Sequence, residues 1–190
     1  MSARVYITGG SGTGTTTLGR AMAEALNVPL LDTDDFYWLP TPSPFTVKRP
    51  AAERVALMTA AQGQGGWVVA GSADGWGDAV IAAADLIVFL RLRTAMRMMR
   101  LREREALRFG PRILPGGDME RTHRAFLDWA AAYDNLYFGG RSLHRHLSWL
   151  STQTAPILEL AGDLPTADQV AASLHKLSSG SVPEAESGLG

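Results

Sequence analysis

A glycine-rich segment near the N-terminus contains the clearest chemistry in the sequence. It places Gly9 and Gly14 at the fixed glycines of the phosphate-loop pattern G-x-x-x-x-G-K-[ST]. Glycines let backbone N–H groups turn inward around a phosphate, and the N-terminus of a following helix adds partial positive charge. The pattern predicts a nucleotide-phosphate site with Thr16 as a Mg²⁺ ligand, and the alternative is a glycine-rich turn without a ligand. The residues assigned to the site are Gly9, Gly10, Ser11, Gly12, Thr13, Gly14, Thr15, Thr16 and Thr17.

One position departs from this pattern, because Thr15 stands where the pattern has lysine. A charge-assisted hydrogen bond contributes about 1.5–3 kcal/mol, so its loss in a transition state costs roughly ten- to a hundredfold in rate. Thr15 can donate a hydrogen bond to a phosphate oxygen but adds no charge. Either another cation enters the site or the chemistry is weak. The available substitutes are Lys48, Arg49 and the arginines that follow residue 93.

Three carboxylates follow the second apolar run of the chain. Asp32, Asp34 and Asp35 come directly after residues 28–31. Ligands of open parallel sheets bind outside the carboxyl ends of the strands, so these side chains are candidates for a binding site. The alternative is that they form an Asx-turn or cap a helix.

A strongly basic segment spans residues 91–112. It contains eight arginines and only Glu103 and Glu105 as acids, which gives about +6 and leaves about −7 for the remainder of a chain whose net charge is −1. An anionic ligand bound to one basic element explains this distribution better than a long nucleic acid does. Five arginines spaced by 4, 3, 4 and 4 residues fall on one helix face: Arg93, Arg97, Arg100, Arg104 and Arg108.

An apolar stripe lies beside the arginines of this segment. We expect it to dock the helix on the body of the protein, leaving the arginines for phosphates. The alternative is a solvated charged face on which Glu105 pairs with Arg108 and Glu103 with Arg100. The stripe consists of Leu92, Met96, Met99 and Leu107.

Short apolar runs alternate with segments of helical periodicity along the chain. This alternation predicts an α/β fold with a parallel sheet and helices on both faces. We expect one domain over residues 1–177 and a loose tail over residues 178–190, which are polar and rich in small residues. The expected strands are residues 5–7, 28–31, 67–70, 86–90 and 157–160, and the expected helices are residues 16–26, 50–61, 93–109, 119–137 and 166–177.

Taken together, the glycine loop, the acidic turn, the arginine segment and the loop after the fifth strand resemble those of small P-loop kinases. The resemblance is to the adenylate, shikimate and gluconate kinase type, including adenylate-kinase-like bacterial proteins, and covers most of the chain. It implies a three-layer P-loop NTPase fold with a five-stranded parallel sheet in the order 2-3-1-4-5. It also implies a short lid at about residues 100–118.

The resemblance further implies roles for individual side chains. Asp32 would support Mg²⁺ through water, and Asp34 would orient or deprotonate an acceptor hydroxyl. Arg100, Arg104 and Arg108 would close over the phosphoryl group as lid arginines, with Lys48 as a further catalytic cation. Asp35, Arg49 and Ser72 would contact the substrate. Asp74 follows the third strand and is a candidate for a second magnesium-shell carboxylate, with capping of its loop as the alternative. The nucleotide base would lie at residues 161–165.

These features predict a Mg²⁺-dependent phosphotransferase that moves the γ-phosphoryl group of ATP to a small-molecule acceptor. A nucleoside monophosphate, a sugar acid and an alcohol all remain possible acceptors. The main alternative is a nucleotide-binding switch protein that lost efficient chemistry with the lysine. A nucleic-acid-binding module is weaker, because no base-stacking aromatics are interleaved with the arginines.

Composition removes several other classes of protein. The chain has no cysteine, which excludes disulfides, thiolate catalysis and zinc–thiolate sites. No apolar stretch approaches the ~20 residues of a membrane helix, and the N-terminus lacks a signal-peptide pattern. We therefore expect a cytoplasmic protein, a monomer or homodimer, that binds neither membrane nor nucleic acid.

Overall fold

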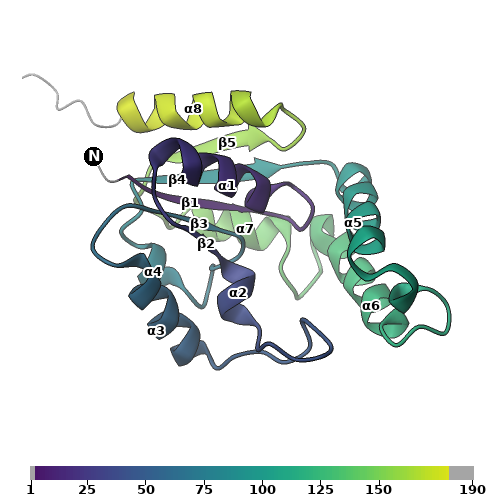
Figure 1. The fold of residues 1–190 in the computed structure, drawn as a ribbon. Helices are drawn as coiled ribbons and strands as arrows, with labels where there is room; N and C mark the ends of the chain where they lie inside the picture. Colours follow the sequence, from purple (N-terminus) through teal and green to yellow (C-terminus); the bar gives the residue numbers. More distant parts are fainter. Residues whose placement is uncertain (1–2, 180–190) are drawn as a thin grey trace, which may run out of the picture.

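The computed structural model describes residues 3–179 and contains a single five-stranded sheet in which all neighbouring strands are parallel (Figure 1). The strand order is β2-β3-β1-β4-β5, as predicted, with β1 at the centre between β3 and β4. The strands are β1 (Arg4–Gly9), β2 (Leu30–Asp32), β3 (Trp67–Ala70), β4 (Leu86–Arg91) and β5 (Ile157–Ala161).

Helices cover both faces of this sheet, because successive side chains of the buried strands point to opposite faces. On one face α1 (Thr15–Leu26) and α8 (Thr166–Ser179) pack against Val5 and Ile7. On the other face Tyr6 packs in a cluster that includes side chains of the remaining sheet-covering helices. These are α3 (Ala51–Gln62), α4 (Asp78–Ile81) and α7 (Leu143–Leu150).

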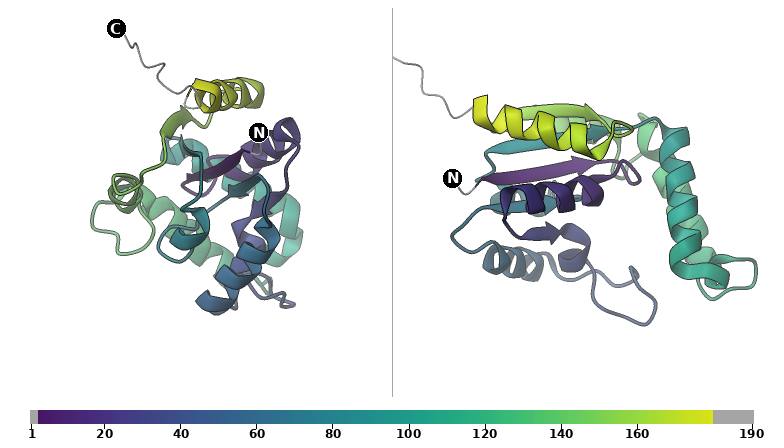
Figure 2. Two further views of the ribbon diagram at one scale, coloured as in Figure 1. Left: turned by 90° about the vertical axis from the view of Figure 1, so that its left-hand side faces the viewer. Right: turned by 45° about the horizontal axis from the view of Figure 1, so that its top comes forward.

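A helical arm stands beyond the carboxyl ends of the strands, as Figure 1 and the right-hand view of Figure 2 show. It packs through its own small clusters, one of which joins Met98, Leu101 and Ala130, while another includes Phe45 from the segment that precedes α3. The arm consists of α5 (Thr94–Phe109), η1 (Gly110–Ile113), α6 (Glu120–Ala131) and η2 (Ala132–Asp134).

Several short elements differ from the predicted ones. The acidic turn contains a five-residue helix, α2 (Thr33–Tyr37), which begins there because the Asp32 side chain accepts a hydrogen bond from the Asp34 N–H. Helices α4 and α7 were not predicted. The helix expected over residues 119–137 is shorter in the structure and consists of α6 followed by the 3₁₀ turn η2. Helix α8 includes residues 178 and 179 of the predicted tail, whereas residues 180–190 lie outside the described residues.

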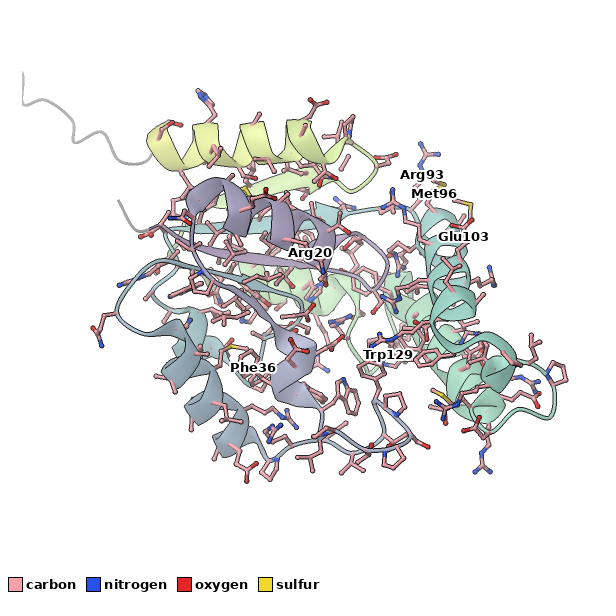
Figure 3. The ribbon with its side chains drawn as sticks, viewed as in Figure 1. Arg20, Phe36, Arg93, Met96, Glu103 and Trp129 are labelled. Carbon is pink, nitrogen blue, oxygen red and sulfur yellow. The ribbon has the colours of Figure 1, made fainter. Side chains whose placement is uncertain are left out.

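The predicted docking face of α5 is wrong. Leu107 is 89% exposed and Met99 is 44% exposed. Figure 3 shows Arg93, Met96 and Glu103 on the side of α5 that points away from the sheet. The buried residues of α5 are Arg97, Met98, Leu101, Glu105 and Phe109.

The reason is that the charged members of this buried face find partners. Arg97 donates to the backbone carbonyls of Ser11 and Ala130, at 3.3 and 3.2 Å, and Glu105 pairs with Arg104 at 2.8 Å. Hydrophobic periodicity does not register such partners, so it selects the wrong side of the helix. Within residues 3–179, no helix combines the length and apolar character needed to cross a membrane.

Candidate functional site

The glycine loop joins the end of β1 to the start of α1 at the carboxyl edge of the sheet. Gly12 and Gly14 have φ angles of +87° and +103°, which favour glycine, and Gly14 is the N-cap of α1. Gly12 is also confined by contact, because a Cβ atom there would lie 2.7 Å from the carbonyl oxygen of Arg97. The loop therefore has the backbone shape that the pattern predicts, and α5 packs directly against it.

A cleft of about 660 Å³ opens in front of this loop. It brings together the acidic turn, three of the predicted arginines and most of the glycine loop, and Arg20 of α1 also lines it (Figure 3). Sequence analysis did not single out Arg20. The residues that line the cleft include Gly12, Thr13, Gly14, Thr15, Thr16, Thr17, Arg20, Asp32, Asp34, Asp35, Phe45, Arg100, Arg104, Arg108, Gly162 and Leu164.

Thr16 and Asp32 meet in the cleft. The Thr16 hydroxyl donates to a carboxylate oxygen of Asp32 at 2.9 Å, and the other carboxylate oxygen accepts the Asp34 N–H at 3.1 Å. Over residues 3–179, the structure contains no group of three or more His, Cys, Asp or Glu side chains that could hold a metal ion by themselves. Mg²⁺ at a phosphate site needs only one or two protein oxygens, because phosphates and waters complete its octahedron. The hydroxyl and carboxylate therefore fit this ion.

The next two carboxylates have an altered proton affinity. Burial raises the pKa of Asp34, and the nearby charge of Asp32 raises it further, while Arg141 opposes both effects. Burial and Asp32 also raise the pKa of Asp35, against the opposing charge of Arg108. A carboxyl group with a raised pKa is a stronger base than an ordinary aspartate, which suits Asp34 to accepting a proton.

The cleft arginines have three different environments. Arg100 donates to the carbonyl oxygen of Gly162 at 2.9 Å, in the loop after β5. Arg104 forms two hydrogen bonds with Glu105, so Glu105 does not form the pair with Arg108 that the alternative of a solvated charged face included. Arg108 stacks on the ring of Phe45, with its guanidinium carbon 4.6 Å from the ring centre.

Four other predicted residues have positions outside the cleft lining. Lys48 is exposed and lies 5.9 Å from the centre of the Tyr37 ring. The Arg49 side chain donates to the Phe36 carbonyl at 3.0 Å, while the Ser72 hydroxyl donates to Asp74 at 2.6 Å. The structure thus does not bring Lys48, Arg49, Ser72 or Asp74 into the cleft. Gly9, Gly10 and Ser11 also lie outside its lining.

Arg141 is a residue near the site that sequence analysis did not find. It donates to the Ser11 hydroxyl at 2.8 Å and lies over the Trp129 ring, 5.2 Å from its centre. Its Nε is buried and has no hydrogen-bond partner among the described residues. Its charge also acts on Asp34. Arg141 therefore lies between the glycine loop and the acidic turn. It stands alone in a loop, so no spacing pattern identifies it.

A buried network supports the glycine loop from behind. The Tyr133 hydroxyl and His146 Nδ1 are 2.6 Å apart, and His146 Nε2 lies 3.4 Å from a carboxylate oxygen of Asp74. A Cβ atom on Gly10 would lie 3.1 Å from the Tyr133 ring. The network therefore connects the loop after β3 to the glycine loop.

Asp74 makes this network sensitive to acid. Burial alone would raise its pKa, but hydrogen bonds from His146 and Ser72 and the charge of His146 outweigh burial and lower the pKa from 3.8 to about 2. A carboxylate with a depressed pKa stabilises the fold above its unfolded-state pKa, and this contribution is lost as the pH falls through the folded-state value.

We expect Asp74→Asn to lower the free energy of unfolding by about 2 kcal/mol at neutral pH. The difference from the unsubstituted protein should shrink to under about 1 kcal/mol near pH 2.5, because Asp74 is then largely protonated when unfolded. Urea unfolding of both proteins at pH 7 and pH 2.5 measures the difference in the free energy of unfolding. A difference that is the same at both would contradict the assigned pKa shift.

Comparisons with known proteins identify relatives of the chain. No protein-family model matches it. The uncharacterized protein YqaC of Bacillus subtilis strain 168 is 37% identical over 180 residues, which cover 94% of this chain and 99% of that protein.

Three solved structures share the fold. A shikimate kinase from Acinetobacter baumannii in complex with shikimate has a TM-score of 0.55 at 16% identity, covering 95% of this chain and 96% of its own. A sugar kinase from Janibacter sp. HTCC2649 has a TM-score of 0.52 at 13% identity, covering 94% and 95%. A gluconokinase from Sinorhizobium meliloti 1021 has a TM-score of 0.50 at 16% identity, covering 94% and 93%. At these sequence identities the similarity establishes the fold alone, so the activity has to be argued from the residues of the cleft.

Proposed function

Since the chain belongs to the same family as YqaC of Bacillus subtilis, and its fold is that of small P-loop kinases, we propose that it is a phosphotransferase. It moves the γ-phosphoryl group of ATP to a small-molecule acceptor and uses Mg²⁺. The observation that carries this proposal is the single cleft in which a glycine loop, the Thr16–Asp32 pair, Asp34 and several arginines meet. Phosphoryl transfer depends on positioning and on neutralising charge, and this combination supplies both.

The donor phosphates lie in the glycine loop. The backbone N–H groups of Gly12 and of Gly14 to Thr16 line the cleft and surround them, and the N-terminus of α1 adds its partial positive charge. Thr16 would hold Mg²⁺, and Asp32 would support it. The ion supplies neutralisation of the charge on the phosphate oxygens when it is bound.

The acceptor lies beside Asp34. Its hydroxyl oxygen forms the new bond to the γ-phosphorus as the bond from that phosphorus to the β–γ bridging oxygen breaks, and ADP leaves. The hydroxyl proton passes to the Asp34 carboxylate, whose raised pKa favours accepting it. The arginines of α5 border the same cleft and neutralise charge on the transferred group.

The first test is calorimetry of ATP binding with and without Mg²⁺. The unsubstituted protein should bind ATP more tightly when Mg²⁺ is present. Thr16→Val should weaken binding of MgATP roughly tenfold, because it removes a hydroxyl ligand, and should abolish the effect of Mg²⁺. Thr122→Val, an exposed substitution on α6, is the matched control and should bind as the unsubstituted protein does. Absence of ATP binding by the unsubstituted protein would refute the proposed function.

A second candidate function is a nucleotide-binding switch with little turnover, which the Thr15 position favours. A panel of nucleoside monophosphates, sugar acids and other alcohols, tested for ADP release with saturating MgATP, separates the two. Acceptor-dependent ADP release supports the transferase. Tight binding of MgATP with no release above the acceptor-free rate supports the switch.

A further inference from the structure

We propose that Arg100 supplies from α5 the positive charge that the glycine loop lacks at Thr15, so that the donor phosphates are held between α1 and α5. This inference rests on the proposed function, because it concerns the same donor site. It identifies which cation replaces the missing lysine. In this proposal Arg100 lies at the phosphate site before any ligand binds. It differs in this from an arginine that reaches the site only when a lid closes.

The first step is that the N-terminal half of α5 forms a wall of the glycine loop. A Cβ atom on Gly12 would lie 2.7 Å from the Arg97 carbonyl oxygen and 3.1 Å from the Leu101 side chain. Arg100 lies between these two contacts along the same helix. Because backbone and buried side chains make this contact, the base of the Arg100 side chain has a fixed place relative to the loop.

The second step is the position of the guanidinium group. One of its nitrogens, Nη1, lies 4.0 Å from the place that a Cβ atom on Gly14 would take, next to Thr15. The same nitrogen donates to the Gly162 carbonyl at 2.9 Å. A Cβ atom on Gly162 would in turn lie 2.6 Å from the Thr13 carbonyl oxygen. The loop after β5 therefore rests on the glycine loop and holds Arg100 against it.

The third step is that Arg100 keeps its charge available. Among residues 3–179 no carboxylate forms an ion pair with it, and one of its nitrogens bonds to a neutral carbonyl. Arginine carries five N–H donors in a planar fork, so donors remain for phosphate oxygens. The short Thr15 side chain leaves the space that a lysine chain would occupy.

Of the other cations near the loop, Arg141 donates to the Ser11 hydroxyl and lies outside the cleft lining, and three more have partners. Arg104 bonds twice to Glu105, and Arg108 stacks on Phe45. Arg97 is fully buried and bonds to Ser11 and Ala130. Arg20 lines the cleft but lies four residues after Thr16, about 6 Å further along α1 from the loop.

The test moves the charge from α5 back to the loop. Arg100→Gln removes the charge and retains a side-chain donor for the Gly162 carbonyl. We expect it to weaken calorimetric binding of MgATP about ten- to a hundredfold. Thr15→Lys in the Arg100→Gln background should recover most of this loss. Thr15→Lys alone should leave MgATP binding equal or weaker, because two cations then compete for one place.

Arg102→Gln is the matched control, because Arg102 is exposed on the same helix and lies outside the cleft lining. It should bind MgATP as the unsubstituted protein does. Arg100→Lys keeps the charge and should stay within a few fold, which separates loss of charge from loss of fold. Equal MgATP binding by Arg100→Gln and the unsubstituted protein would overturn the inference, as would failure of Thr15→Lys to rescue a folded Arg100→Gln protein. If the unsubstituted protein binds no nucleotide, the proposed function fails instead.

Discussion

Asp34→Asn is expected to lower the rate of acceptor-dependent ADP release about 10²–10⁴-fold, which is the usual contribution of a general base. The substitution preserves the shape of the side chain but removes its ability to take a proton. Asp34 contacts the Thr16–Asp32 pair through its backbone N–H, which the substitution retains, so the affinity for MgATP should change by less than about threefold. Initial rates with the best acceptor from the panel, together with calorimetry, measure both quantities.

The pH dependence of this reaction has a direction that the structure fixes. Asp34 must be ionised to accept a proton, and burial together with Asp32 raises its pKa. The acid limb of kcat/KM for MgATP, which reports groups of the free enzyme, should therefore lie at higher pH than the ordinary aspartate value of about 3.9. Asp128→Asn, an exposed carboxylate substitution on α6, should leave both the rate and the limb unchanged. Full activity of the Asp34→Asn protein would remove this residue from the mechanism.

Arg97→Met is expected to lower the free energy of unfolding by about 3 kcal/mol or more. The Arg97 guanidinium is fully buried and donates to the Ser11 carbonyl of the glycine loop and the Ala130 carbonyl of α6. It also donates to the Thr94 hydroxyl and stacks on the Tyr133 ring, at 4.6 Å from the ring centre. Methionine fills part of the space but leaves the two buried carbonyls without donors.

The burial of Arg97 also affects the pKa of its guanidinium group. Burial lowers the pKa of this arginine, and the charge of Asp134 partly opposes that shift. Urea unfolding measures the loss of stability in Arg97→Met. Arg102→Met, at an exposed position of the same helix, should remain within about 0.5 kcal/mol of the unsubstituted protein. Similar stabilities for the two variants would mean that Arg97 does not tie α5 to the loop.

The contrast between neighbouring arginines shows where sequence analysis stops. Arg97 and Arg100 fall on one helical face by spacing, and both were expected to face phosphates. In the structure Arg97 is fully buried among carbonyls, while Arg100 borders the cleft. Both side chains are long and charged, so only the groups that surround each one distinguish a structural tie from a binding residue.

Arg141 and His146 show a second kind of limit. Arg141 contacts Ser11, which lies 130 residues earlier in the chain, and His146 lies beside Asp74, which lies 72 residues earlier. Contacts of this range arise when the α6–α7 segment folds back across the strand ends. No local pattern encodes such a return, because neither a single arginine in a loop nor a single histidine on a helix forms a periodic pattern.

The sequence by itself determined the strand order through its resemblance to known folds, and it located the glycine loop and the acidic turn through contiguous residues. These features depend on local conformation and on buried strands, whose signals lie within a few neighbouring positions. The tertiary structure alone decided which arginines face the cleft, which face of α5 is buried, and that Lys48 lies outside the site. Those outcomes depend on hydrogen bonds and ion pairs between residues that are far apart in the sequence. A charged side chain can be buried only where the fold places such partners beside it.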